Sequence, residues 1–321
     1  MLLLLAAAVF VVSCAGTRVL IALLRRGAVL DRPNERSSHV VPTPRGGGIA
    51  VIGAALAAWL VLCAAGVAPP ATVVVVLGGA VLAVVSWFDD LRGLSPGVRL
   101  AVQFAAVVAG MWALPHGAVF QGWLPSGLDA IAAALLWVWF VNLFNFMDGI
   151  DGIAASEAAV IGIGIVAVAG GFGLAAPAAM LAAAALGFLV WNWAPARIFL
   201  GDVGSIPLGY LLGFLLYRLA SRGEWQAALI LPLYFLADAT ITLLRRLARG
   251  ERVWQAHREH FYQRAVQRGL DHAAVVRLVI AADIVLIACA WAAAQGWGFA
   301  ALGVAALTVA VLLVELSRGL R

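Results

Sequence analysis

Two amides and two carboxylates close one long apolar run of the chain. They lie in the segment Asn142-Leu-Phe-Asn145-Phe-Met-Asp148-Gly-Ile-Asp151-Gly. A lipid-facing helix has no use for such groups, because each unpaired polar group in hydrocarbon costs several kcal/mol. Spacings of three residues keep the first three on one side of a helix, and the glycines then allow a turn. The segment predicts a polar site at a membrane–water boundary; a plain polar helix end is the alternative.

Adjacent carboxylates also end an earlier apolar run, at Asp89-Asp90. Two neighbouring carboxylates repel each other unless a cation or an arginine lies between them. Magnesium favours one or two carboxylates together with substrate phosphate oxygens, which such a pair at the interface can supply. The alternative is an Asp-Asp helix cap with Arg92 as its partner.

A third acidic cluster is Gly201-Asp202-Val-Gly-Ser205, which precedes another apolar run. The pattern is partly a helix-capping signal, with Asp202 or Ser205 near the N-cap. A helix N-terminus with a carboxylate and the aromatic Phe199 nearby can also bind a metal–nucleotide complex.

Two further loops carry basic and histidine residues. The loop from Arg25 to Gly48 holds Arg45 and three consecutive glycines. Glycines let backbone approach a ligand, and basic residues with exposed amides suit phosphate; a connector whose charge sets topology is the alternative. In the last loop, His257 and His260 have the spacing of metal ligands on a helical face, but no third ligand for zinc lies nearby. An amphipathic helix on the bilayer and contacts to phosphate or sugar stay open for this loop, and we expect His272, at its end, to be solvated.

The elements that must position these residues are apolar. Hydrophobic residues make up 64% of the 321 residues and charged residues 12%, which indicates a polytopic, all-α membrane protein with a single domain over 1–321. The first run has no small-residue cleavage site after it and is expected to remain as a span. We count eleven apolar runs, near 2–24, 48–66, 72–88, 98–114, 129–146, 154–171, 176–193, 206–217, 226–244, 273–294 and 299–316.

The basic residues divide unevenly between the two sets of loops that eleven spans create. All 21 are arginines, and one set of loops holds only Arg218 and Arg222. The positive-inside rule makes the arginine-rich set cytoplasmic, with the N-terminus outside and the C-terminus inside. The net charge of +5 therefore reports topology and attraction to anionic lipid or substrate, and requires no nucleic-acid partner. The predicted cytoplasmic loops are 25–47, 88–98, 147–153, 194–205 and 245–272.

All of these clusters converge on the predicted cytoplasmic face. Many acids beside many arginines suit a reaction in which a metal ion and guanidinium groups neutralise several phosphate charges. Phosphoryl transfer needs mainly this neutralisation and the alignment of the attacking and leaving oxygens.

The same motifs, in order over residues 30–265, resemble polyprenyl-phosphate N-acetylhexosamine-1-phosphate transferases of the glycosyltransferase 4 type. These include undecaprenyl-phosphate N-acetylglucosamine-1-phosphate and phospho-N-acetylmuramoyl-pentapeptide transferases. The resemblance implies Mg²⁺-dependent transfer, with Mn²⁺ as the alternative ion, of a sugar 1-phosphate from a UDP-N-acetylhexosamine to undecaprenyl phosphate, releasing UMP. The motifs that carry it are Asp31-Arg-Pro…Arg36…His39…Pro42-Thr-Pro-Arg-Gly-Gly47, Asp89-Asp90, Asn142-x-x-Asn145-x-x-Asp148-Gly-x-Asp151-Gly, Gly201-Asp-x-Gly-Ser205 and His257-x-x-His260.

The resemblance also implies roles, position by position. Asp202 resembles the main magnesium ligand, with Asp89 and Asp90 near the metal and the acceptor phosphate. Asn142 matches the amide at the diphosphate–metal site, with Asn145 as a further substrate contact and Asp148 as a catalytic carboxylate. A uridine pocket is matched by Asp151, Asn192 and Phe199, with Phe199 stacking on uracil. Arg45 and Arg99 match residues on the acceptor phosphate, and His257 and His260 match the catalytic histidines.

Two departures from the family motifs bear on the expected donor sugar and on the contacts to the acceptor phosphate. Position 259 is Glu where many relatives carry histidine, and the His-Arg-x-His-Phe-Tyr-Gln pattern is similar to enzymes that start O-antigen or related surface glycans. This favours N-acetylglucosamine or a 6-deoxy-N-acetylhexosamine over a pentapeptide-bearing donor. Arg92 and Arg99 stand where some relatives carry lysine, and arginine holds phosphate by a fork rather than a point charge.

The expected protein is thus a multi-pass enzyme of the bacterial inner membrane, in contact with membrane lipid and with its site facing the cytoplasm; a homodimer is left open. No Ser, Cys or His has a convincing nucleophile–base arrangement, so we expect a single displacement in which the lipid phosphate attacks the donor's β-phosphorus. A transporter of nucleotide-sugar or polyprenyl phosphate is the alternative. Transporters place their polar groups near the bilayer midplane, often in broken helices, whereas here these groups gather at one face.

Overall fold

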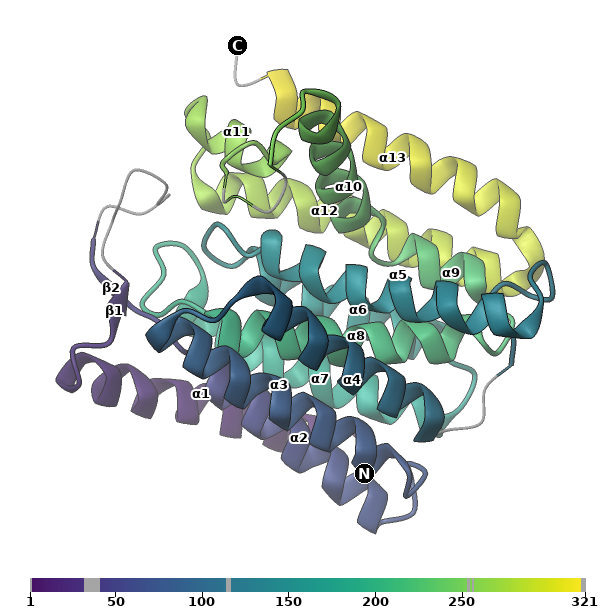
Figure 1. The fold of residues 1–321 in the computed structure, drawn as a ribbon, viewed down its shortest axis with the longest axis horizontal. Coiled ribbons are helices and arrows are strands. Elements are labelled where there is room, and N and C mark those ends of the chain that lie inside the picture. The colour runs from purple at the N-terminus through teal and green to yellow at the C-terminus, as the bar shows by residue number, and fades with distance from the viewer. Residues whose placement is uncertain (1, 32–40, 114–116, 253–254, 256, 319–321) are drawn as a thin grey trace.

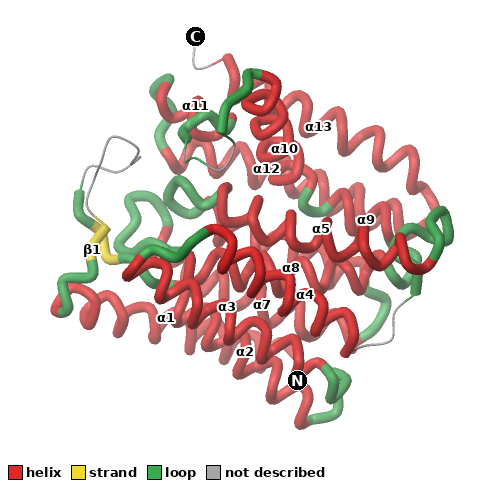
Figure 2. Tube along the Cα trace, viewed as in Figure 1, coloured by secondary structure: helices red, strands yellow, loops and turns green. Residues whose placement is uncertain are grey.

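The protein is almost entirely helical (Figures 1 and 2). The computed structural model describes all residues except 1, 32–40, 114–116, 253–254, 256 and 319–321. The described helices are α1 (Leu2–Arg26), α2 (Gly48–Ala64), α3 (Thr72–Arg92), α4 (Pro96–Ala113), α5 (Ser126–Phe146), α6 (Ile153–Val168), α7 (Phe172–Asn192), α8 (Asp202–Ala220), α9 (Trp225–Ile230), α10 (Leu233–Ala248), α11 (Phe261–Gln267), α12 (His272–Ala292) and α13 (Gly298–Arg318). The two short strands β1 (Leu30–Asp31) and β2 (Thr43–Pro44) pair antiparallel, with Leu30 opposite Pro44.

The helices confirm an all-α, polytopic membrane protein. Seven helical stretches in the described chain are long and apolar enough to cross a membrane, and α2 and α6 are shorter apolar helices. One of the seven is α12 and α13 together, joined by the π-helical turn η1 (Ala293–Trp297), where Gly296 has φ +96°. Because α12 and α13 pack against each other (Figure 1), this stretch holds both of the apolar runs predicted there. The number of spans and their orientation remain predictions.

The predicted run 226–244 is not one continuous helix. α9 ends at Ile230 and α10 begins at Leu233, with Pro232 at the N-cap of α10. Proline has no N–H to donate to the preceding turn, and its ring clashes with the carbonyl four residues earlier. This break was not predicted from hydrophobicity.

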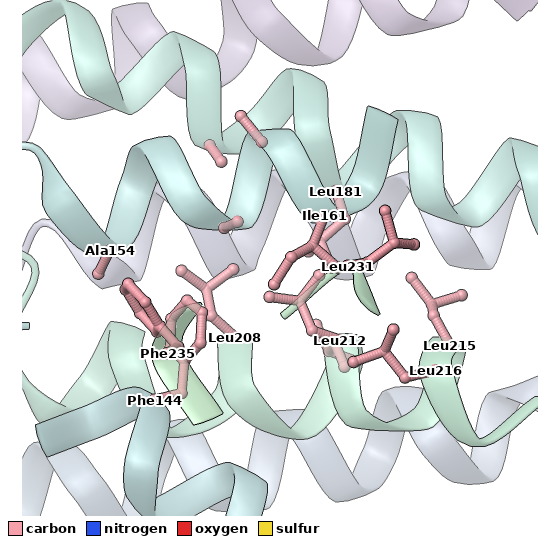
Figure 3. Packing of buried hydrophobic residues seen from close by; sticks show 14 of the residues in the cluster. Phe144, Ala154, Ile161, Leu181, Leu208, Leu212, Leu215, Leu216, Leu231 and Phe235 are labelled. Atoms are coloured by element: carbon pink, nitrogen blue, oxygen red, sulfur yellow. The ribbon is translucent and has the colours of Figure 1, made fainter. Parts of the chain in front are cut away.

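Helix α8 forms the centre of the bundle. Every residue from Val203 to Tyr217 is buried, as expected of a helix that is apolar on all sides. The helix packs against α2, α3, α5, α6 and α7. Figure 3 shows its side chains Leu208, Leu212, Leu215 and Leu216 among Phe144 of α5, Ile161 of α6, Leu181 of α7, and Leu231 and Phe235. The central place of α8 fixes the position of its first residue, Asp202.

Two glycines allow the start of α2 to touch the start of α8. A Cβ placed on Gly48 would lie 2.2 Å from the Cα of Gly204, and a Cβ on Gly204 would lie 2.6 Å from the Cα of Gly48. Small residues permit this close approach of helices, as they do in other membrane proteins. The contact brings the loop before α2, which carries Arg45, against the N-terminus of α8.

Candidate active site

Arg45 lies between two carboxylates from different helices. Its Nη2 is 2.7 Å from Asp90 Oδ1 and 2.9 Å from Asp202 Oδ1. Asp90 is in the last turn of α3, Asp202 is the first residue of α8, and the N–H of Val203 donates to Asp90 Oδ2 at 3.3 Å. The predicted cap role of Asp202 is wrong, because the N-cap is Gly201 and the N–H of Val203 in the first turn is taken up by Asp90 of α3. The three segments therefore meet through charged side chains.

Asp89 pairs with a different arginine than Asp90 does. Arg99 Nη1 on α4 is 2.9 Å from Asp89 Oδ2, and the N–H of Leu94 donates to Asp89 Oδ1 at 2.6 Å. Arg92, the partner expected of a simple Asp-Asp cap, instead places its guanidinium 5.8 Å from the centre of the Phe88 ring. Asp89 thus pairs with Arg99, and Asp90 with Arg45, which Asp202 shares; these two arginines relieve the repulsion between the adjacent carboxylates.

Asp148 lies beside this group, in the loop 147–152. Burial raises the pKa of Asp148 well above its usual range, the nearby carboxylates of Asp202, Asp90 and Asp151 raise it further, and Arg45 opposes them. The structure therefore brings Asp148, Asp90 and Asp202 into one electrostatic cluster, to which the described residues contribute Arg45 as the arginine. Such a cluster attracts a further cation.

The two amides of α5 have separate partners. Asn145 Oδ1 accepts a hydrogen bond of 2.6 Å from Ser205 Oγ, which links the end of α5 to the start of α8. Asn142 donates through Nδ2 to Gln103 Oε1 on α4, at 2.7 Å, and to the carbonyl of Val138. Ser205 therefore joins helices and does not cap α8.

The loops 147–152 and 193–201 are joined by a second set of contacts. Asp151 Oδ2 accepts from the N–H of Ala196 at 2.9 Å. Asn192 is buried; its Oδ1 accepts from the N–H of Gly152 and its Nδ2 donates to the carbonyl of Ile198. In this structure the oxygen and the nitrogen of the Asn192 amide each bond to one of the two loops and so hold them together.

The glycine loop serves packing rather than phosphate. The N–H groups of Gly46 and Gly47 donate to the carbonyl of Phe199, and that of Gly48 donates to the carbonyl of Leu200. The N–H groups of these three glycines are therefore paired with backbone carbonyls, and are not the exposed amides expected for phosphate. The same hydrogen bonds place Phe199 next to Arg45, with which it forms a parallel β-bridge.

The histidines lie on a loop and not on one helical face. His260 is the N-cap of α11 and is buried, with its Nδ1 3.1 Å from Asp238 Oδ1 on α10. Asp238 also accepts from the N–H groups of Phe261 and Tyr262. The ring of His257 is centred 4.9 Å from that of His260. Burial, the neighbouring His260 and Arg246 lower the pKa of His257 to about 4.

Helix α11 joins the histidine loop to the aspartates. Tyr262 Oη donates to the carbonyl of Phe146, two residues before Asp148, at 3.1 Å. Among the described residues, neither histidine forms a hydrogen bond or an ion pair with Asp90 or Asp202. Arg36 and His39, which belong to the first motif of the resemblance, lie outside the described residues.

Three partners were not identified from the sequence. They are Gln103, Asp238 and His272, each from a segment distant in sequence from the residue it contacts. His272 was expected to be solvated, but its Nδ1 is 3.3 Å from Asp151 Oδ2 and its side chain is 14% exposed. For Gln103 and Asp238 a signal existed, since a polar side chain within an apolar run needs a partner.

No three His, Cys, Asp or Glu side chains form a ready metal cage in the described part of the chain. Magnesium does not require one, because it is commonly held by one or two carboxylates plus phosphate oxygens. Asp90 and Asp202 each place an oxygen within 2.9 Å of the same Arg45 nitrogen, so the two carboxylates face one small region. Their oxygen donors suit a hard cation. The repulsion between Asp148 and the neighbouring carboxylates also favours the binding of a cation here.

Comparison with known proteins agrees with this arrangement. The chain matches the sequence model of glycosyl transferase family 4 over residues 72–220. It is 32% identical to a decaprenyl-phosphate N-acetylglucosaminephosphotransferase of Mycobacterium tuberculosis, over 79% of this chain and 73% of that one. It is 28% identical to a probable undecaprenyl-phosphate N-acetylglucosaminyl 1-phosphate transferase of Bacillus subtilis, over 82% of this chain and 78% of the relative.

A third relative is matched over a shorter range. The phospho-N-acetylmuramoyl-pentapeptide-transferase of Streptococcus thermophilus is 35% identical over 47% of each chain. The similarity to the N-acetylglucosamine-phosphate transferases thus extends over much more of the chain. This protein is a membrane transferase that belongs to the polyprenyl-phosphate N-acetylhexosamine-1-phosphate transferase family.

Proposed function

We propose that this protein transfers an N-acetylhexosamine 1-phosphate from a UDP-sugar to undecaprenyl phosphate and releases UMP. The observation that carries the proposal is the Arg45 guanidinium shared by Asp90 and Asp202, with Asp148 beside them. Four separate segments build this cluster at one end of a bundle of apolar helices. A carboxylate–arginine cluster there suits a reaction between two phosphorylated substrates, one of them anchored in lipid.

The residues divide into two groups by the substrate that they face. Arg99 and Arg45 would hold phosphate oxygens of the acceptor and donor, each released from its carboxylate when phosphate takes its place. The loops joined by Asp151 and Asn192, with Phe199, would receive the uridine, and Asn142 and Asn145 would fix the end of α5 beside the diphosphate. His257 and His260 lie on the loop that α11 holds against the residues preceding Asp148.

Asp202, Asp90 and Asp89 are the residues that would hold Mg²⁺, with Mn²⁺ as the alternative ion. The ion would supply charge neutralisation on the diphosphate and help to align it. A phosphate monoester is largely ionised near neutral pH, so the acceptor oxygen attacks the donor's β-phosphorus directly with little need for a base. The phosphorus–oxygen bond to UMP breaks as the new one forms. Asp148 contributes a carboxylate whose proton affinity is raised, and Arg45 offsets its charge.

The sugar and the product follow from the relatives and the histidine loop. Both relatives with long matches are named for N-acetylglucosamine, which supports this donor over a peptide-bearing one. The arginine-rich loops support a site on the cytoplasmic side of a bacterial inner membrane, where UDP-sugars are made. The lipid-linked product would start a surface glycan such as O-antigen.

Purified protein in lipid nanodiscs, given labelled UDP-N-acetylglucosamine, Mg²⁺ and undecaprenyl phosphate, tests this function. We expect UMP and a labelled lipid, both dependent on the polyprenyl phosphate and both lost on chelation of the divalent ion. A panel of UDP-N-acetylhexosamines in the same assay identifies the sugar. Uptake of intact UDP-sugar into proteoliposomes without UMP release would contradict the proposal and favour a transporter.

A further inference from the structure

We propose that His272 is a positioning residue that holds Asp151 in the orientation needed to bind the donor's uracil. This inference rests on the proposed function, because it deepens the role of the same site. His272 belongs to none of the sequence motifs that carry the family resemblance. Its contact with Asp151 is seen only in the fold, which brings residues 121 positions apart together.

The place of His272 is fixed by two helices. Asp271 is the N-cap of α12 and accepts from the N–H of Ala274 at 2.6 Å, so His272 is held as the first residue of the helix. Helix α12 packs along α6, which begins at Ile153 directly after the loop 147–152. The His272 ring is therefore presented to that loop by well-packed elements, and its side chain is only 14% exposed.

A single atom of His272 contacts Asp151 twice. Its Nδ1 is 3.3 Å from the backbone N–H nitrogen of Asp151 and 3.3 Å from Asp151 Oδ2. As a neutral acceptor, Nδ1 receives the backbone hydrogen bond; when it carries a hydrogen, it donates to the carboxylate. In either form His272 restrains Asp151, through its backbone or through its side chain.

This restraint leaves one carboxylate oxygen for a ligand. Within the described chain, the contacts of the Asp151 carboxylate with His272 and with the N–H of Ala196 both involve Oδ2. Ala196 lies in the loop that carries Phe199, the candidate for stacking on the base. A uracil ring has an N–H donor at N3 where cytosine has an acceptor, so a carboxylate with a fixed free oxygen discriminates between the two bases.

Three variants test the inference by the kinetics of UMP release and by the binding of UMP alone. His272→Ala should raise KM for the UDP-sugar, and Kd for UMP, roughly five- to tenfold, as expected for the loss of a hydrogen bond. The kcat and the KM for the polyprenyl phosphate should stay within about twofold. His272→Asn, whose amide can take the place of Nδ1, should restore much of the affinity for UMP. His272→Ala should also bind UMP and CMP with more similar affinities than wild type does.

The matched control is Asp271→Asn, whose amide oxygen can still accept from Ala274 and cap α12, so that only the charge beside His272 changes. Unchanged KM and UMP affinity in His272→Ala would overturn the inference, as would an equal loss in Asp271→Asn, which would assign the effect to charge at the helix end. If wild-type protein neither binds UMP nor releases it from any UDP-sugar, the proposed function itself fails. Wild-type turnover with an unaffected His272→Ala variant overturns this inference alone.

Discussion

At the scale of single residues, the chemistry depends on how many carboxylates share each positive charge. Arg45 serves Asp90 and Asp202 together, and Asp148 adds a further negative charge close by. Asp89, in contrast, has Arg99 to itself. Among the described residues this first group therefore has more carboxylates than arginines, which favours the entry of phosphates together with a cation.

Replacing Asp202 with Asn should remove transfer without unfolding the protein. The amide keeps the shape of the side chain but loses the charge that would hold the metal, so we expect kcat to fall at least about a hundredfold, as when a group that stabilises transition-state charge is removed. UMP release and the thermal melting of the same sample measure both effects. Glu224→Gln, near the start of α9 and outside the candidate site, is the charge-matched control, and near wild-type turnover by Asp202→Asn would end the assignment.

His257 should make the protein less stable in mild acid. Its pKa is lowered to about 4 in the fold, against about 6.5 in an unfolded chain. Between these values the unfolded chain binds a proton that the folded protein does not, so stability falls as the pH decreases from 6.5 towards 4. His257→Gln removes this titration. Melting temperatures between pH 7.5 and 5 should therefore fall less for the variant than for wild type, and parallel curves would contradict the prediction.

At the scale of elements, hydrophobicity predicted where helices occur better than where they end. Helix α3 continues through Asp89 and Asp90 to Arg92, so these carboxylates lie on a helix and not in the loop 88–98. For the last loop, a helix was only one of the alternatives, and the start of α11 at Phe261 was not predicted. Its first turn is stabilised by Asp238 of α10, from outside the loop, together with a capping box formed by His260 and Gln263. The motifs identified most of the acidic residues, but not their partners. Partner choice depends on packing between distant segments, as the Asn142–Gln103 contact shows.

A methyl group at Gly48 should separate two helices and disrupt the site. Its Cβ would lie 2.2 Å from the Gly204 Cα, so α2 and α8 must move apart, displacing Arg45 from Asp202. We expect Gly48→Ala to cost about 1–3 kcal/mol or more, as overpacking does, and to lower turnover sharply. Gly53→Ala on the same helix meets nothing within 4 Å and should be neutral or slightly stabilising. Melting and UMP release on both variants test the contact, and equal behaviour of the two would refute it.

At the scale of the whole molecule, the predicted site comes together at one end of the bundle. The segments that build it connect helix ends gathered there, at the left of Figure 1, where β1 and β2 also lie. The sequence placed these segments on one face because arginines concentrate between alternate apolar runs. It could not give the depth of the site or the central position of α8, since those depend on how the helices pack.

The uneven distribution of arginine between the two ends of the bundle predicts which end faces the cytoplasm. Arg222 lies in the loop between α8 and α9, at the arginine-poor end, and Arg268 lies between α11 and α12, at the arginine-rich end. In a background without Cys14, Cys63 and Cys289, we expect Ser221→Cys to react with a membrane-impermeant maleimide in cells whose outer barrier alone is opened. Arg268→Cys should react only after the inner membrane is permeabilised. Both sites lie outside the apolar helices, so the reagent can reach each from its own side.

The orientation in the membrane also decides whether the site can reach its proposed donor, because UDP-sugars are made in the cytoplasm. If Arg268→Cys were labelled from outside and Ser221→Cys were not, the Asp90–Asp202 cluster would face a compartment that lacks the proposed donor. The reaction would then need another source of activated sugar, although the aspartates and arginines would remain in place. Labelling in the expected order instead puts the donor, the divalent ion and the head of the lipid acceptor on the side where Arg45 meets its two carboxylates.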